Sequence, residues 1–160
     1  MKGLAALAAM AAVVLALGAE ISGAAAQPSA NGNGNTGFST FSFSARGVNF
    51  GADGHVTFTN PNTDPNQVFK GRVNCLAIVN NQAYMSGNIV SISPAQNPLT
   101  APTDFFAYAE DNGEPGEFRD RFGFFTFTPS TTFAPSCLNP LAFFTGSLIT
   151  SGNVDVDPVP

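Results

Sequence analysis

Two aromatic segments joined by a charged turn constrain the fold of this chain more than any other part of its sequence. The first segment runs from Phe105 to Ala109 and the second from Arg121 to Thr128. Successive side chains of an extended strand alternate between two faces, and here both faces are largely apolar. The residues 111–116 between them, DNGEPG, cannot continue a strand and therefore turn the chain. We expect this hairpin to be covered on both sides, or to belong to a closed barrel or sandwich.

Several other segments show the short apolar pattern of β-strands, with turn residues between them. They are residues 38–45, 55–59, 68–79, 82–92, 141–150 and 153–157. Asn80-Asn81 suits a tight hairpin turn, and Gly87 indicates a bulge or the close approach of another segment. Regular alternation places Val73 and Cys75 on the same face of the 68–79 segment.

Together these segments predict an all-β fold. About eight antiparallel strands with mostly local connections form a meander that closes into a barrel or a two-sheet sandwich, and the pattern does not separate these two. The 16 phenylalanines supply the core. Their rings either fill the interior, which is the favoured interpretation, or line a cavity for a small apolar ligand.

The N-terminal residues have the organisation of a cleaved signal peptide. A positive start at Met1-Lys2 precedes an apolar run, and Ala24-Ala25-Ala26 supplies the small residues of a cleavage site. The next residues, QPSANGNGNTG, are polar and low in complexity, which is typical of a flexible leader. The expected organisation is a signal peptide at 1–26, a flexible leader at 27–37, a single β domain at 38–157 and a tail at 158–160.

Cys75 and Cys137 both lie in the expected mature chain. Export would place them in a compartment where disulfides persist. An even pair with no histidine nearby is a good disulfide candidate and a poor metal site. We therefore expect a Cys75–Cys137 bridge, with two free buried thiols as the alternative. The expected location is the cell envelope or the extracellular space, with no membrane span after signal cleavage.

The charge balance excludes some classes of partner. The chain has a net charge of -5, from 6 Lys and Arg against 11 Asp and Glu. So few basic residues cannot build the positive face that a nucleic-acid-binding protein needs. The negative balance also argues against docking on anionic lipid.

An acidic stretch in the aromatic hairpin is the main candidate site. Carboxylates and an amide oxygen are the ligands that calcium prefers, and the candidate ligands are Asp111, Asn112, Glu114 and Asp120. Their spacing does not match an EF-hand loop. The alternative is a solvated turn whose charges keep the hairpin soluble, and the sequence favours this alternative.

The sequence identifies no catalytic residues. Two carboxylates of the hairpin could act as a general acid and base on a glycoside, but that needs a fixed separation across a cleft, which a hairpin tip rarely provides. His55 is the only histidine and no G-x-S-x-G motif occurs, so a Ser-His-Asp system is not indicated. A surface role for His55 is the simpler interpretation.

Four runs of sequence resemble a group of small exported bacterial β domains. These runs are GHVTF, VNCLAIVNNQAYMSGNI, FFAYAEDNGEPGEFRDRFGF and ITSGNVDV, and the resemblance, with the phenylalanine-rich segment before them, covers about residues 38–156. Post-COAP-type domains are similar, and EDNGEPG followed by DRF is the most specific part. The resemblance implies an exported β domain and transfers no catalytic residue.

These observations lead to one functional expectation and two alternatives. The expectation is an exported non-enzymatic β module with a structural or binding role at the cell surface or in the envelope. The first alternative is a barrel that binds a small apolar ligand. The second is a hydrolase that depends on the carboxylates of the hairpin.

Overall fold

The computed structural model describes residues 26–63, 65–113, 119–128, 136–139 and 145–158. Within these ranges nine strands form one antiparallel sheet in the order β8-β7-β6-β5-β4-β3-β2-β1-β9. The strands are β1 (Ser29–Asn35), β2 (Thr40–Arg46), β3 (Asp53–Asn60), β4 (Gln67–Val79), β5 (Gln82–Ser93), β6 (Asp104–Glu110), β7 (Arg121–Phe127), β8 (Ser147–Leu148) and β9 (Ser151–Asp157).

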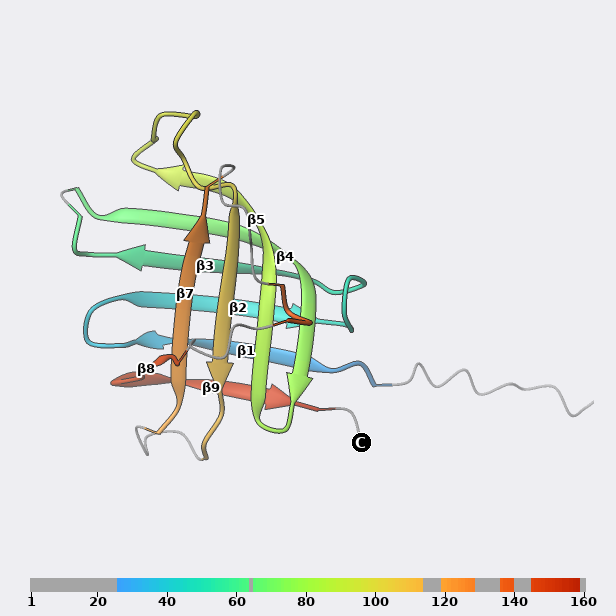
Figure 1. Cartoon of the computed structure of the whole chain (residues 1–160). Coiled ribbons are helices and arrows are strands. Elements are labelled where there is room, and N and C mark those ends of the chain that lie inside the picture. The colour runs from blue at the N-terminus through green and yellow to red at the C-terminus, as the bar shows by residue number, and fades with distance from the viewer. Residues whose placement is uncertain (1–25, 64, 114–118, 129–135, 140–144, 159–160) are drawn as a thin grey trace, which may run out of the picture.

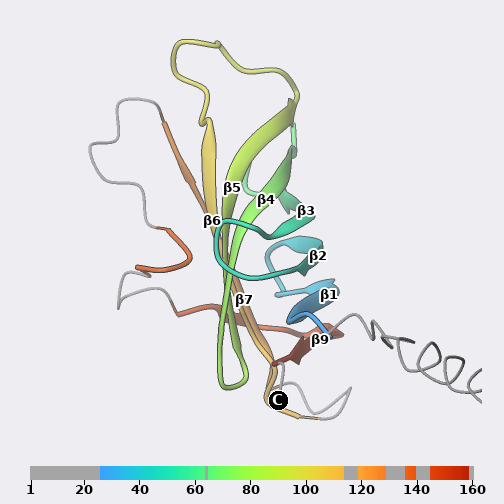
Figure 2. The same ribbon diagram turned by 90° about the vertical axis from the view of Figure 1, so that its right-hand side faces the viewer.

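The sheet is a meander curled into a half-barrel, so the all-β prediction is confirmed. Figure 1 shows β1, β2, β3 and β9 crossing β7 at a steep angle, while the long β4 and β5 curve from one direction into the other. The view in Figure 2 shows the two groups of strands facing one another. Because β9 pairs with β1, the last strand returns to the beginning of the meander.

Irregular pairing between β4 and β5 accompanies the bend. The register shifts between Lys70 and Gly71, and again between Val73 and Cys75. A β-bulge adds one residue and increases the local twist. After the second shift Leu76 joins the core with Val73, whereas Cys75 lies outside that core cluster. The prediction that Val73 and Cys75 share a face is therefore wrong, because the inserted residue reverses the alternation.

Stacked phenylalanine rings fill the space between the two groups of strands. Phe41 of β2 and Phe122 of β7 have ring centroids 4.0 Å apart and nearly parallel planes. Phe58 and Phe124 lie 4.7 Å apart, and Phe105 stacks on Phe124 at 5.5 Å. Burying one such side chain contributes about 1.5–3 kcal/mol. The aromatic residues of strands far apart in the sequence thus hold the curled sheet together.

The prediction of a flexible leader over residues 27–37 is wrong for Ser29–Asn35, which form β1 between β2 and β9. Asn31 and Asn33 are exposed, while the glycines alternate with them on the other face. A Cβ atom on Gly32 would lie 2.7 Å from the Phe43 ring, so the missing side chain makes room for that ring. The repeat is therefore a strand pattern of period two, in which glycine takes the inward positions.

The first arm of the aromatic hairpin, β6, is buried on both faces, as expected, whereas Phe122 is the one buried residue of the second arm, β7. Phe105 and Ala107 of β6 belong to the core. Phe106 and Tyr108 point to the opposite face and are also buried, with Phe106 fully inaccessible. The segment that carries Cys137 lies over this second face, since its disulfide partner Cys75 and its hydrogen-bond partner Ser86 come from β4 and β5.

Two predictions fall partly on residues without a described position. The signal peptide lies almost wholly outside the described residues, and so does much of the strand expected at 141–150. Of that strand the structure describes Ser147–Leu148 as β8. Among the described residues no helix is long and apolar enough to span a membrane.

Candidate functional site

The base of the acidic hairpin contacts the edge strand β9. Asp120 is a buried residue just before β7. Its Oδ1 accepts a hydrogen bond from the Asn112 N–H at 2.9 Å, and its Oδ2 accepts one from the Val154 N–H at 3.0 Å. One carboxylate thus joins the two sides of the hairpin and attaches them to β9.

Asp111 repeats this arrangement one step further along β9. Its Oδ1 accepts from the Gly113 N–H at 3.2 Å, and its Oδ2 accepts from the Val156 N–H at 3.3 Å. Because β9 is the last strand of the sheet, one side of its backbone has no neighbouring strand among the described residues. The two carboxylates occupy that side, where they satisfy backbone donors that a closed barrel would pair with another strand.

Asn112 fixes the shape of the hairpin base. Its Nδ2 donates to the carbonyl oxygen of Arg119 at 3.0 Å, and its Oδ1 accepts from Asn81 Nδ2 at 3.0 Å. Asn81 Nδ2 also lies 2.6 Å from the carbonyl oxygen of Asp111. The sequence indicated only a turn at Asn80-Asn81, so this contact between two hairpins was missed.

Three of the four candidate calcium ligands therefore lie together, and the fourth, Glu114, lies outside the described residues. Asp111, Asn112 and Asp120 all bond to protein groups. The described ranges contain no group of three or more His, Cys, Asp or Glu side chains placed to hold a metal. The described contacts instead satisfy backbone N–H groups at the open edge of β9.

A second polar cluster lies on the outer face of β5 and β6. Tyr84 pairs with Tyr108 across the two strands, with ring centroids 5.5 Å apart. Tyr108 Oη donates to Glu110 Oε2 at 2.7 Å, and Tyr84 Oη donates to Gln82 Oε1 at 2.6 Å. Arg121 Nε lies 3.8 Å from the same Glu110 oxygen. Both tyrosines lie in strands that the sequence predicts. Their pairing was missed because it depends on the register of the two strands.

Burial governs the ionisation of both tyrosines. Loss of solvent raises the pKa of Tyr84, and the negative charge of Glu110 raises it further. The pKa of Tyr108 is also raised, first by burial and then by its hydrogen bond to Glu110. Both hydroxyls therefore stay protonated at neutral pH and act as hydrogen-bond donors.

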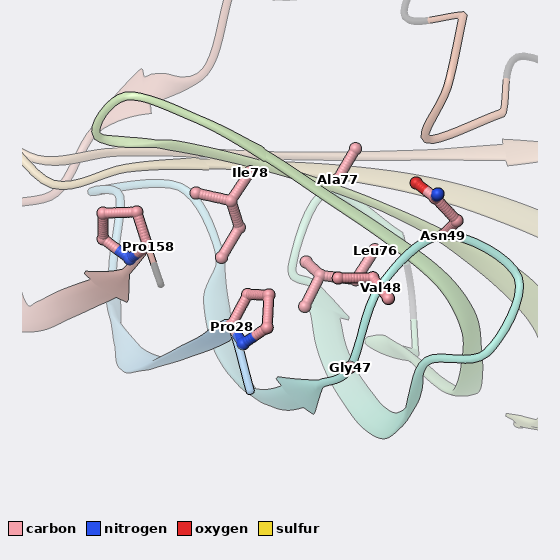
Figure 3. A pocket seen from close by; sticks show the side chains of 8 residues that line it. All are labelled: Pro28, Gly47, Val48, Asn49, Leu76, Ala77, Ile78 and Pro158. Atoms are coloured by element: carbon pink, nitrogen blue, oxygen red, sulfur yellow. The ribbon is translucent and has the colours of Figure 1, made fainter. Parts of the chain in front are cut away.

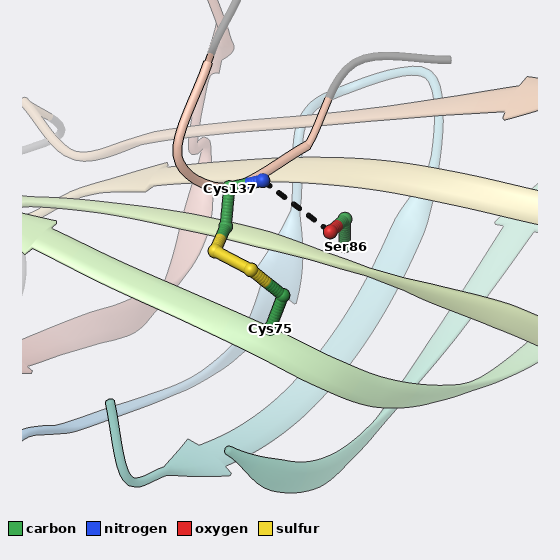
Figure 4. Close-up of a disulfide and its surroundings, with 3 residues drawn as sticks. All are labelled: Cys75, Ser86 and Cys137. Atoms are coloured by element: carbon green, nitrogen blue, oxygen red, sulfur yellow. Dashed lines mark hydrogen bonds between the residues drawn. A yellow bond between two sulfur atoms is a disulfide. The ribbon is translucent and has the colours of Figure 1, made fainter. Parts of the chain in front are cut away.

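The expected disulfide is present and joins β4 to the segment over the outer face. Cys75 and Cys137 are bridged with a Cα–Cα distance of 5.7 Å, and both are buried. Figure 4 shows that Ser86 Oγ accepts a hydrogen bond from the Cys137 N–H, at 3.3 Å. Ser86 is the register partner of Phe106, so the bridge holds the segment on the face of the sheet that carries Phe106.

His55 lies on the exposed face of β3, between Ser44 and Arg72 in the strand register. The carboxylate of Asp53 pairs with Arg72 at 3.2 Å, and no hydrogen bond or ion pair of His55 occurs among the described residues. The arrangement gives His55 no orienting carboxylate, which a catalytic histidine of the Ser-His-Asp type requires.

A small pocket opens where β4 separates from β3. Its volume is about 250 Å³. Figure 3 shows that it lies between the end of β4, the loop from β2 to β3 and the two ends of the described chain. The residues that line it are Pro28, Gly47, Val48, Asn49, Leu76, Ala77, Ile78 and Pro158. The lining is apolar apart from Asn49 and the exposed backbone, and no pattern in the sequence predicts this pocket.

Comparison with protein-family models, with curated proteins and with solved structures finds no match. The resemblance to post-COAP-type domains therefore rests on the sequence motifs alone.

Proposed function

We propose that this chain is an exported non-enzymatic β module with a structural or binding role at the cell surface or in the envelope. The observation that carries this proposal is the use of the hairpin carboxylates. Asp120 and Asp111 each accept backbone N–H groups from the hairpin itself and from β9. Carboxylates held in this way face the protein and stabilise its fold.

The disulfide supports the extracytoplasmic part of the proposal. Cys75 and Cys137 form a buried bridge, which is consistent with an oxidising compartment. The apolar run before residue 27 and the Ala24-Ala25-Ala26 site supply the export signal that this location requires.

The carboxylate-dependent hydrolase is less well supported. A general acid and a general base must face a substrate across a cleft at a fixed separation. Here the two aspartates bind backbone N–H groups two residues apart on β9, those of Val154 and Val156. Both carboxylates point toward the β9 backbone, which favours a structural role.

Expression of the full chain in a bacterium, followed by cell fractionation, tests the proposal. We expect processing after Ala26, an oxidised Cys75–Cys137 pair and retention of the protein by isolated envelopes. Mass spectrometry of the intact protein, before and after thiol alkylation, measures the first two. A Lys2→Glu variant is the control for export, because it removes the positive start of the signal peptide.

A reduced protein with its leader intact in the cytoplasm would contradict the export proposal. The non-enzymatic part fails if the purified protein has an activity that Asp111→Asn or Asp120→Asn abolishes without lowering the free energy of unfolding.

A further inference from the structure

We infer that the pocket at the end of β4 binds one residue of an extended peptide, with an apolar side chain in the pocket and the peptide backbone against Ile78. This inference rests on the binding role proposed above and names its ligand. Two independent features carry it, an unpaired strand edge and an apolar pocket beside that edge.

The strand edge follows from the pairing of Leu76. Its N–H and C=O bond to Asn49 of the β2–β3 loop, at 3.1 and 2.7 Å. Backbone groups two residues apart on a strand point to the same side, so the N–H and C=O of Ile78 point toward the side on which Asn49 lies. Asn49 forms an isolated bridge with Leu76 alone, and β3 pairs with β4 only as far as Val73.

Nothing in the described part of the chain pairs with Ile78 on this side. The described residues nearest to it toward the two termini are Pro28 and Pro158, and proline has no N–H with which to donate to the Ile78 carbonyl. The carbonyl of Pro28 already accepts from the Gly47 N–H at 3.0 Å. Ile78 therefore presents one donor and one acceptor, the same pair that one residue of an extended peptide offers in return.

The pocket beside Ile78 determines what the peptide carries. Val48, Leu76 and Ile78 give it an apolar wall, and no charged side chain lines it. Its volume of about 250 Å³ is below the usual range for drug-sized ligands, roughly 300–1,000 Å³, and suits a single amino-acid residue. The neutral lining favours an uncharged aliphatic side chain.

The segments that line the pocket also carry exposed apolar side chains. Val48, Phe50 and Val79 are more than half exposed, at 57%, 70% and 54%. Val48 and Phe50 come from the loop that forms one wall, and Val79 follows Ile78 at the end of β4. Exposed apolar side chains in the segments that line a pocket are typical of a binding surface. A peptide residue bound to the free edge at Ile78 would add to the sheet, as in recognition by strand addition.

Titration of the isotopically labelled, exported and oxidised protein with N-acetyl-leucine N-methylamide, followed by NMR, tests the inference. We expect saturable shifts of the Ile78 and Val48 amide signals. Two matched probes separate the contributions of backbone and side chain. The ester 2-acetoxy-4-methylpentanoic acid N-methylamide has an oxygen in place of the leucine N–H, and N-acetylglycine N-methylamide lacks the side chain. Each should bind about tenfold or more weakly.

Protein variants provide the second measurement. Val48→Asp places a charge in the pocket wall at an exposed position, so the fold should persist while the leucine amide binds about tenfold or more weakly. Val90→Asp is the matched control, because Val90 is also more than half exposed and does not line the pocket. Its affinity for the probe should be unchanged.

Several outcomes would overturn the inference. Equal binding of the amide and the ester would show a pocket for apolar groups without peptide recognition. Shifts of Ile78 that depend on protein concentration in the absence of the probe would show pairing between two copies. Absence of saturable binding would also overturn it. Binding of the probe by a protein that envelopes do not retain would instead contradict only the proposed location.

Discussion

The carboxylate of Asp120 accepts a hydrogen bond from the backbone N–H of Val154 at 3.0 Å, although β7 and β9 lie near opposite ends of the strand order. The half-barrel is thus connected across its gap by a side chain. Asp111 accepts a hydrogen bond from the N–H of Val156 in the same way. We call these two contacts between the acidic hairpin and the edge strand β9 the clasp.

Loss of this clasp should destabilise the fold. Asp120→Ala removes a buried acceptor and leaves the N–H of Val154 without its partner. Since hydrogen bonds to charged groups contribute about 1.5–3 kcal/mol, we expect a loss of about 3 kcal/mol in urea unfolding. The control Asp155→Ala changes an exposed carboxylate of β9 and should stay within about 0.5 kcal/mol. Equal effects of the two substitutions would contradict the clasp.

The inward glycines of β1 should not tolerate a side chain. Gly32→Ala places a Cβ against the Phe43 ring, and overpacking of this kind costs about 1–3 kcal/mol. Thermal unfolding of the variant measures the loss. Phe43→Leu in the same chain should recover part of it, because the smaller side chain leaves room for the new methyl group. A Gly32→Ala protein as stable as the parent would show that β1 does not pack on Phe43.

Removal of the disulfide should weaken the segment over the outer face. In the chain-entropy model a bridge that closes a loop of this length contributes roughly 4 kcal/mol. We expect Cys75→Ala with Cys137→Ala to lose about this amount in urea unfolding. The chain has 2 tyrosines and no tryptophan, so near-ultraviolet circular dichroism also reports on the Tyr84–Tyr108 pair beside the bridge. An unchanged midpoint would contradict this role.

The tyrosine pair should make the fold sensitive to alkaline pH. The raised pKa of Tyr84 and Tyr108 means that the unfolded chain, with a tyrosine pKa of about 10, loses its protons first. The free energy of unfolding is therefore unaffected below that pH and falls as the pH rises above it. Glu110→Gln removes a negative neighbour and should lower both pKa values. Ultraviolet absorbance of tyrosinate, measured against pH, follows the change.

Calcium should leave the thermal midpoint unchanged, because both oxygens of Asp111 and of Asp120 already accept backbone hydrogen bonds. Melting curves with millimolar calcium and with a chelator make the comparison. A ligand at 100 times its Kd would add about 2.7 kcal/mol to the stability of the native state. A rise of that size, abolished by Asp111→Asn, would establish a calcium loop instead.

Much of the strand arrangement could be predicted from local pattern. The alternation in Phe105–Ala109 predicted burial on both faces, and Asn80-Asn81 predicted the tight turn at which Asn80 has a positive φ of 57°. Pairing of Cys75 with Cys137 followed from their number and the expected compartment. Each of these predictions depends on residues close in sequence or on a chemical pairing with no competitor.

The failures have a different origin. The bulge after Val73 cannot be read from alternation, because it is an interruption of that pattern. Asp111 and Asp120 looked like surface charges or metal ligands, since the contact with β9 depends on how the whole sheet curls. β1 was missed because its composition is that of a linker. The reason for its inward glycines appears only in the structure, where the Phe43 ring of the neighbouring strand β2 takes the space that a side chain on Gly32 would need.

The repeated Asn-Gly pairs of β1 have a consequence for the length that this strand can have. Because the repeat has the period of the strand, insertion or deletion of one pair leaves asparagine outside and glycine under the rings of β2. Such a change would move the N-terminal end by about 7 Å along the sheet. The length of β1 can therefore vary by two residues at a time while the interior of the domain stays the same.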